Sequence, residues 1–197
     1  MSKAEGSGVN RRRFIVNSAT VAAGTWAMAS RPLAQTAQSK TRIAIVGTGS
    51  RGSGTWGSEL MRHHSDVVEI VGLCDINRKR VEAARELIGL NAPTFLDFDA
   101  MIRETRPQSV VVTTVDGTHY RYIIRAMELG CDVITEKPMC TDEEQCQAII
   151  DAQKQTGRQI TVTFNARHGD LARKVKELLL EKAVGEVTTI DFHEFLN

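Results

Sequence analysis

The chain has 197 residues, a formal net charge of +1 and 42% hydrophobic residues. This length suffices to bury one full hydrophobic core and part of a second. The 25 basic residues nearly balance the 24 acidic ones, so no overall charge draws the chain to nucleic acid or to an anionic membrane. A small molecule is the expected partner.

The four cysteines form neither a CxxC pair nor a spaced Cys/His cluster of the kind that zinc requires, so we expect no metal site. Cys74 and Cys131 lie in apolar runs, where a thiol packs as a small hydrophobic group. Free thiols are therefore favoured over disulfides.

Residues 1–40 have the layout of an export signal and linker. Three arginines at 11–13 precede a mildly apolar stretch at 18–29, which offers a small-x-small cleavage site. The stretch is too short to anchor the chain in a membrane, and residues 10–16 resemble the twin-arginine motif. We expect export to the periplasm by the twin-arginine route, without stable membrane insertion; a disordered basic tail is the alternative.

The apolar run Ile43–Val46 is typical of a parallel strand buried on both faces, and it leads directly into Gly47-Thr48-Gly49-Ser50-Arg51-Gly52. In a strand, turn and helix of this kind, the first glycine permits the tight turn and the second lets backbone amides approach a diphosphate. The third lets the helix pack against the strand, and the helix N-terminus favours negative charge. The motif predicts a dinucleotide site formed by Gly47, Gly49, Ser50, Arg51 and Gly52.

A second strand is expected at 67–74, and Asp75 ends it, 23 positions after Gly52. At about this spacing an acidic residue binds the two hydroxyls of the adenosine ribose. An ionised Asp75 also repels a 2′-phosphate, which favours NAD, although Arg78 weakens that preference and keeps NADP in view. The alternative is a structural glycine turn with a solvated aspartate at a strand end.

Beyond Asp75 the chain alternates helical and strand patterns, which is typical of an open parallel sheet covered on both faces. The expected fold class is α/β, with a Rossmann-type doubly wound parallel sheet over residues 41–164. The expected strands lie at 110–115, 131–135 and 160–164. Helices are expected at 78–89 and 98–104. A third helix is expected to carry Tyr120, Ile123, Ile124 and Met127 on one face. A fourth begins with a capping box at 141–144, and its residues Cys146, Ile149 and Ile150 are expected to face inward.

Ligands of such sheets bind beyond the carboxyl ends of the strands, and the motifs at those ends resemble the Gfo/Idh/MocA family of oxidoreductases. The resemblance covers residues 41–197 and is carried by 47–52, Asp75, 113–119 and Glu136-Lys137-Pro138, with weaker support from 164–167 and 183–187. It implies an NAD(P)-dependent oxidoreductase in which Thr114 and Glu136 line the cofactor site. It also implies that Lys137 reaches the substrate near the nicotinamide ribose.

A lysine at this edge of the sheet is a compact cation that can bind a sugar hydroxyl and stabilise a forming alkoxide; an ordinary surface lysine is the alternative. His119 opens a helix, where a positioning or capping role stands beside a direct catalytic one. Asn165 and Arg167 follow the last strand and are expected to line the substrate pocket. A structural Arg167, paired with a carboxylate, is the alternative.

Residues 165–197 are expected to form only the start of a substrate domain. The pattern predicts a helix at 171–182 and a first strand from Val187 with Ile190 and Phe192 on one face; His193 is given no role. The family resemblance implies that the rest of this domain supplies substrate contacts, a proton acceptor and an oligomer interface. We therefore expect the full-length form to be a homo-oligomer and nucleotide binding to be a firmer property of this chain than turnover.

Three functions fit these motifs. The first is a dehydrogenase that moves a hydride between NAD(P) and a hydroxyl carbon of a sugar, polyol or related compound. The second is an NAD-dependent glycoside hydrolase of the same fold, which the intact Glu136-Lys137-Pro138 disfavours. The third is a non-catalytic dinucleotide-binding module.

Overall fold

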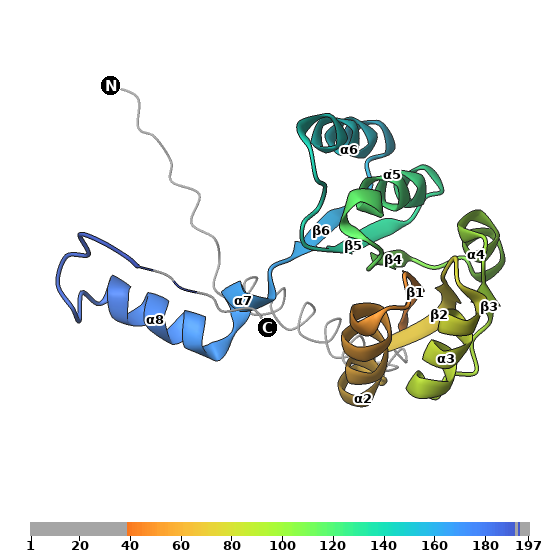
Figure 1. Cartoon of the computed structure of the whole chain (residues 1–197), viewed down its shortest axis with the longest axis horizontal. Coiled ribbons are helices and arrows are strands. Elements are labelled where there is room, and N and C mark those ends of the chain that lie inside the picture. Colours follow the sequence, from red (N-terminus) through yellow and green to blue (C-terminus); the bar gives the residue numbers. More distant parts are fainter. Residues whose placement is uncertain (1–38, 192, 194–197) are drawn as a thin grey trace, which may run out of the picture. The chain divides into compact units, whose positions relative to one another are not determined.

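The computed structural model describes residues 39–191 and residue 193. Six parallel strands form one sheet in the order β3-β2-β1-β4-β5-β6 (Figure 1). This order reverses direction between β1 and β4, as in doubly wound dinucleotide-binding sheets, and it confirms the expected fold class. The strands are β1 (Thr41–Val46), β2 (Val68–Cys74), β3 (Thr94–Phe95), β4 (Ser109–Val112), β5 (Asp132–Glu136) and β6 (Ile160–Thr163).

Helices cover both faces of the sheet (Figure 1). One face carries η1 (Arg51–Glu59), α2 (Leu60–His64) and α3 (Arg78–Ile88). The other carries α4 (Phe98–Thr105), α5 (His119–Glu128) and α6 (Glu143–Thr156). The short turn η2 (Asp116–Thr118) joins β4 to α5, and α7 (Asn165–His168) and α8 (Asp170–Leu180) follow β6.

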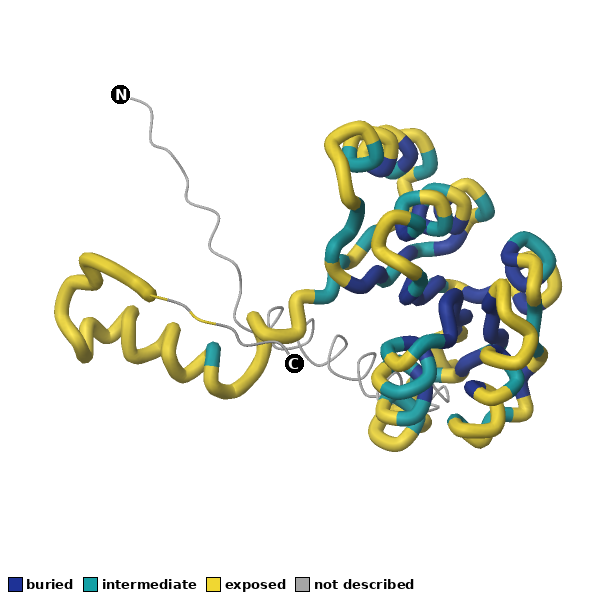
Figure 2. Tube along the Cα trace, in the orientation of Figure 1, coloured by how far each residue is buried: buried dark blue, intermediate teal, exposed yellow. Residues whose placement is uncertain are grey.

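The central strands are buried on both faces, as their continuous apolar runs predict (Figure 2). In β1, Ile43 and Ile45 belong to the cluster that includes Val81 of α3. Ala44 and Val46 point the other way, into the cluster completed by α4, α5 and α6. The period-two alternation of a strand thus divides one apolar run between two cores.

The fourth strand is shorter than the sequence predicts. A strand was expected over 110–115, but β4 ends at Val112 and the chain then turns toward η2. Thr113 explains the turn, because its N–H donates to the carbonyl of Val46 at 2.9 Å and its hydroxyl donates to the carbonyl of Gly47. These bonds tie the chain after β4 to the turn after β1.

The start of α6 also differs from expectation. Asp142, rather than the first residue of the expected capping box, is the N-cap, and its Oδ1 accepts a hydrogen bond from the N–H of Gln145 at 2.8 Å. Ile149 is buried as predicted, whereas Ile150 is 37% exposed and Ala152 takes the inward position. The prediction for Ile150 was wrong because packing against α5 selects a narrower face than the apolar pattern suggests.

The segment after the sheet is mostly exposed. The expected helix is confirmed as α8, but Leu171 and Leu180 are 80% and 75% exposed. No strand forms in the described residues between α8 and residue 191, so the strand expected from Val187 is wrong for that part. An extended segment has no strand partner there to satisfy its backbone; Phe192 lies outside the described residues.

All four cysteines are free thiols, with Cys74 and Cys131 buried and Cys140 and Cys146 half-buried. Within the described ranges, no three His, Cys, Asp or Glu side chains gather as metal ligands would. Nor does any helix there combine the length and the apolar character needed to cross a bilayer. The predicted export signal lies almost entirely outside the described residues.

Close backbone contact fixes the turn after β1. Gly47 has φ +88°, and a Cβ on it would lie 2.6 Å from the backbone of Thr113 and Thr114. A Cβ on Gly52 would lie 2.0 Å from the carbonyl oxygen of Gly47. The first and third glycines of the motif are therefore required by the packing of β1, η1 and β4, before any ligand is considered.

Gly52→Ala should lower the free energy of unfolding by about 1–3 kcal/mol, because the added methyl group forces the turn and η1 apart. Gly54→Ala is the matched control: it lies in the same helix, and a Cβ there meets nothing within 4 Å. Urea denaturation of both variants measures the effect. Equal stability of Gly52→Ala and the wild type would contradict the close approach.

Candidate functional site

A pocket of about 240 Å³ lies at the carboxyl ends of β1, β2 and β4. This is the place where the strand order reverses and where doubly wound sheets bind ligands. Four predicted cofactor residues line it together: Gly47, Gly49, Asp75 and Thr114. The other lining residues are Val46, Cys74, Ile76, Arg80, Thr113, Val115, Thr118 and Tyr122.

Asp75 is only 5% exposed and braces the glycine turn. Its Oδ2 accepts hydrogen bonds from the N–H of Thr48 at 2.8 Å and from the Thr48 hydroxyl at 3.0 Å. Its Oδ1 accepts one from the N–H of Asn77 at 2.9 Å. The carboxylate thus has a structural role in addition to its place in the pocket wall, which corrects the alternative of a solvated aspartate.

The cation beside Asp75 is Arg80. The guanidinium Nη1 of Arg80 lies 3.7 Å from Oδ1 of Asp75, and Arg80 lines the pocket. Arg78, which the sequence suggested for this place, pairs instead with Glu82 at 4.0 Å. Arg80, the third residue of α3, therefore lies at the end of β2, whereas Arg78, the first residue, does not.

The lining of this pocket includes the thiol of Cys74 and the aromatic ring of Tyr122. Burial, and then the charge of Asp75, raises the pKa of Cys74 to about 12. Burial also raises the pKa of Tyr122, whose ring packs edge-on against Phe98 with centroids 5.2 Å apart. Cys74 is a hydrophobic wall residue with a very low thiolate fraction at neutral pH.

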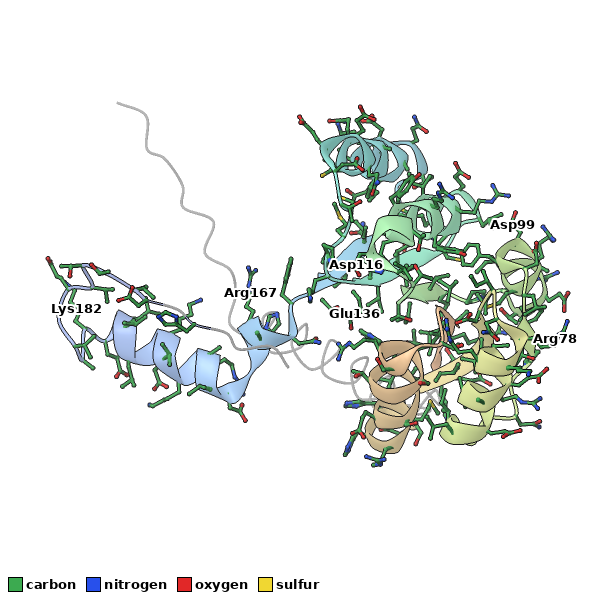
Figure 3. The ribbon with its side chains drawn as sticks, in the orientation of Figure 1. Arg78, Asp99, Asp116, Glu136, Arg167 and Lys182 are labelled. Carbon is green, nitrogen blue, oxygen red and sulfur yellow. The ribbon has the colours of Figure 1, made fainter. Side chains whose placement is uncertain are left out.

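A second pocket opens at the carboxyl ends of β4 and β5. Its lining residues are Arg51, Thr113, Thr114, Asp116, His119, Glu136 and Lys137. Thr113 and Thr114 line both pockets, so the two pockets adjoin and share this wall; together they are called the groove. Figure 3 shows Asp116 and Glu136 at this end of the sheet.

Glu136, in the second pocket, is held by hydrogen bonds from two side chains of η1. It is 7% exposed, and its Oε1 accepts hydrogen bonds from Nε of Arg51 at 3.0 Å and from the indole N–H of Trp56 at 2.9 Å. Residues five apart share a face in the i to i+5 winding that η1 adopts, so both donors of one helix reach one oxygen. This network ties η1 to the end of β5.

Lys137 is exposed and lines the second pocket. Its ammonium group forms no ion pair with any described residue, and the adjacent Glu136 is paired with Arg51. His119 is 1% exposed, and its ring nitrogens face the carbonyl oxygens of Pro138 at 2.7 Å and Thr114 at 2.9 Å. Lys137 and His119, the two residues predicted to be catalytic, thus line the same pocket. Lys137 is exposed and has no ion pair with any described residue, whereas His119 is buried.

The glycine turn is shaped to admit a diphosphate. A Cβ on Gly49 would meet nothing within 4 Å, so the open space over that backbone lies on the pocket side. Ser50 makes no side-chain capping bond at the start of η1, which leaves helix N–H groups of the first turn available to an anion. These features fit a dinucleotide laid across the groove.

Asn165 and Arg167 are not brought to Lys137. Asn165 lines a separate depression with Trp56 and His63, on the side of η1 and α2. The guanidinium of Arg167 lies over the ring of Phe164, 5.1 Å from its centroid, in place of the carboxylate that the structural alternative required. The chain described here places both residues outside the groove.

The structure adds groove residues that the sequence did not single out, among them Arg80, Trp56, Tyr122 and Asp116. Arg80 could have been found, because α3 begins only four residues after the last residue of β2, so its first turn lies close to the site. Trp56 could not, since only the i to i+5 winding of η1 directs it to Glu136.

Residues 41–164 match the model of the oxidoreductase family with an NAD-binding Rossmann fold that is named GFO_IDH_MocA. The chain therefore belongs to this oxidoreductase family. The matched segment contains every groove residue described above.

Individual relatives agree with this assignment. A Bacillus subtilis protein that carries the name oxidoreductase YteT is 33% identical over 159 residues, which are 79% of this chain and 37% of the relative. The inositol 2-dehydrogenase/D-chiro-inositol 3-dehydrogenase of Lactiplantibacillus plantarum is 29% identical over 154 residues, 77% of this chain and 43% of the relative. The chain spans less than half the length of these relatives.

A similar solved structure is the WlbA dehydrogenase from Bordetella pertussis in complex with NADH and UDP-GlcNAcA. It is 25% identical, with a TM-score of 0.68, and the match covers 75% of this chain and 44% of that one. The fold over the matched part is therefore that of a dehydrogenase crystallised with its nicotinamide cofactor.

Asp75→Asn should weaken NAD binding about tenfold or more, because a charged acceptor contributes roughly 1.5–3 kcal/mol to a hydrogen bond from a hydroxyl. It should also raise affinity for NADP relative to NAD, since the repulsion of a 2′-phosphate disappears. Calorimetric titration with both dinucleotides measures this, with the exposed Asp66→Asn as the control. Unchanged affinity for both would remove Asp75 from the ribose site.

Proposed function

We propose that this chain is the nucleotide-binding part of an NAD(P)-dependent dehydrogenase that moves a hydride between the cofactor and a hydroxyl carbon of a sugar, polyol or related compound. The observation that carries the proposal is the single groove across the sheet. One half holds a buried carboxylate beside a glycine turn, and the other holds an unpaired lysine.

Different residues of the groove would bind different parts of the dinucleotide. Gly47, Gly49 and Gly52 shape the turn, and the N–H groups of Ser50 and Arg51 at the start of η1 would bind the diphosphate. Asp75 and Arg80 lie on the adenosine side, where the carboxylate accepts from ribose hydroxyls. Thr114 and Glu136 line the other half, toward the nicotinamide.

When bound, the nicotinamide supplies the hydride acceptor. Lys137 would bind the substrate hydroxyl and stabilise negative charge on its oxygen, while the hydroxyl proton passes to the proton acceptor that the family resemblance assigns to the substrate domain. Glu136 is already paired with Arg51, so it offers Lys137 no free carboxylate. NAD is the preferred cofactor, and Arg80 reduces the discrimination against NADP.

The substrate class follows from the relatives whose names state their ligands. One acts on inositol and another was crystallised with a UDP-sugar acid. We extend to this chain only what these share, a ring compound rich in hydroxyl groups. Asn165 and Arg167 lie outside the groove, so their contact with substrate stays a prediction. We also propose that the protein assembles as a homo-oligomer, as the family resemblance implies.

Lys137→Ala should leave NAD affinity within about threefold and lower kcat/KM by roughly 10²–10³, the loss typical of removing one group that stabilises transition-state charge. The matched control is Lys154→Ala, an exposed lysine of α6. Calorimetry measures NAD binding, and nicotinamide absorbance with a panel of sugars and polyols measures turnover.

The same assay separates the other candidate functions. Release of aryl glycosides without net cofactor reduction would replace the proposal with a glycoside hydrolase. NAD binding without either reaction would leave a binding module. Absence of binding to either dinucleotide would overturn the proposal altogether.

We also propose that residues 1–40 direct the folded protein to the periplasm by the twin-arginine route. Arg11→Lys combined with Arg12→Lys should retain the protein in the cytoplasm, because the route reads the arginine pair. Arg13→Lys is the control, since it lies outside the pair and should export normally. Cell fractionation measures both, and export of the double variant would contradict the proposed route.

A further inference from the structure

One carboxylate of the groove has no partner among the described residues. Asp116 is the first residue of η2, is exposed, and lines the second pocket together with Lys137. Its carboxylate makes no ion pair with any described residue and accepts no hydrogen bond from one. An acceptor in a pocket that the protein itself leaves unsatisfied is available to the hydrogen-bond donors of a ligand.

The backbone that carries Asp116 is held on both sides. Before it, the carbonyl of Val115 accepts hydrogen bonds from the N–H of Thr118 at 2.8 Å and from the Thr118 hydroxyl at 2.6 Å. After it, His119 is 1% exposed and begins α5. The fold therefore presents the Asp116 side chain from a closed turn, and a ligand would not have to order this backbone in order to bind.

The other carboxylate of the second pocket is already in use. Glu136 is 7% exposed, and its Oε1 accepts hydrogen bonds from Arg51 and from Trp56. Lys137, the remaining charged side chain of this pocket, is a donor only. Asp116 is therefore the carboxylate of this pocket that can accept from a ligand without losing a contact inside the protein.

The polar groups of the groove follow the order of the strands. The sheet order β2-β1-β4-β5 places Asp75, the glycine turn at 47–52, Asp116 and Lys137 one after another along its carboxyl edge. A nicotinamide dinucleotide has a corresponding order: a ribose with two free hydroxyls, a diphosphate, a second such ribose, and the nicotinamide ring. Adjacent strands lie about 4.8 Å apart, so a dinucleotide with its first ribose at Asp75 and its diphosphate at the turn continues with its second ribose toward the end of β4.

We propose that Asp116 is a cofactor-binding residue whose carboxylate accepts hydrogen bonds from the two hydroxyl groups of the nicotinamide ribose, as the counterpart of Asp75 at the adenosine ribose. Two carboxylate oxygens match two neighbouring hydroxyl donors. The contact holds the nicotinamide half of the cofactor in the pocket that Lys137 lines, while Lys137 stays available to the substrate. This inference rests on the proposed function, because it requires a dinucleotide in the groove.

Three probes that differ by one group at a time test the assignment. ADP ends at the diphosphate, ADP-ribose adds the second ribose, and NADH adds the nicotinamide ring. Asp116→Asn should weaken ADP-ribose and NADH about tenfold each, because it removes a charged acceptor, and should leave ADP within about twofold. Calorimetric titration measures the three affinities. Asp66→Asn, which neutralises an exposed aspartate outside the groove, is the matched control and should change none of them.

A second variant and a stability measurement separate binding from folding. Asp116→Glu keeps a carboxylate on a longer side chain, so its affinity for ADP-ribose should lie between those of Asp116→Asn and the wild type. Urea denaturation should give the same midpoint for all three forms, because the Asp116 carboxylate is exposed and bonds to no described residue.

Every other pattern of affinities contradicts the assignment. A loss for NADH alone would place Asp116 at the ring instead of the ribose, and an equal loss for all three probes would mean that the whole groove has changed. Unchanged or tighter binding of ADP-ribose would make Asp116 an ordinary surface charge. These results overturn the role of Asp116 alone, whereas a wild type that binds none of the probes overturns the proposed function with it.

Discussion

The backbone of Gly47 lies against that of Thr113 and Thr114 so closely that no side chain fits between them. This contact joins the turn after β1 to the turn after β4, and it occurs where the strand order reverses. Both halves of the groove share Thr113 and Thr114 as a wall for this reason. A sheet with any larger residue in the turn would push β1 and β4 apart at the point where a dinucleotide crosses them.

The charged side chains of the groove differ in whether the protein itself provides them with a partner. Two buried carboxylates lie at the carboxyl ends of β2 and β5, and each accepts hydrogen bonds from the turn or helix that follows β1. Asp75 accepts from Thr48, and Glu136 accepts from Arg51 and Trp56. The protein thus satisfies both carboxylates, whereas Lys137 forms no ion pair with any described residue.

The family match and the packed cores cover the same part of the chain. The matched segment is an NAD-binding Rossmann fold, and both hydrophobic clusters lie within it. Beyond it, the leucines of α8 are exposed and belong to neither cluster. The relatives are more than twice as long as the matched part.

The sequence by itself determined the sheet, the glycine turn, Asp75 and the family, because these depend on local periodicity and on glycines at fixed spacing. It did not determine where β4 ends, which residue of α3 turns toward Asp75, or how His119 is enclosed. Those features are decided by contacts between segments far apart in the chain, such as Thr113 with Gly47 and His119 with Pro138. Only the folded sheet brings these partners within hydrogen-bond distance, so no local pattern carries a signal for them.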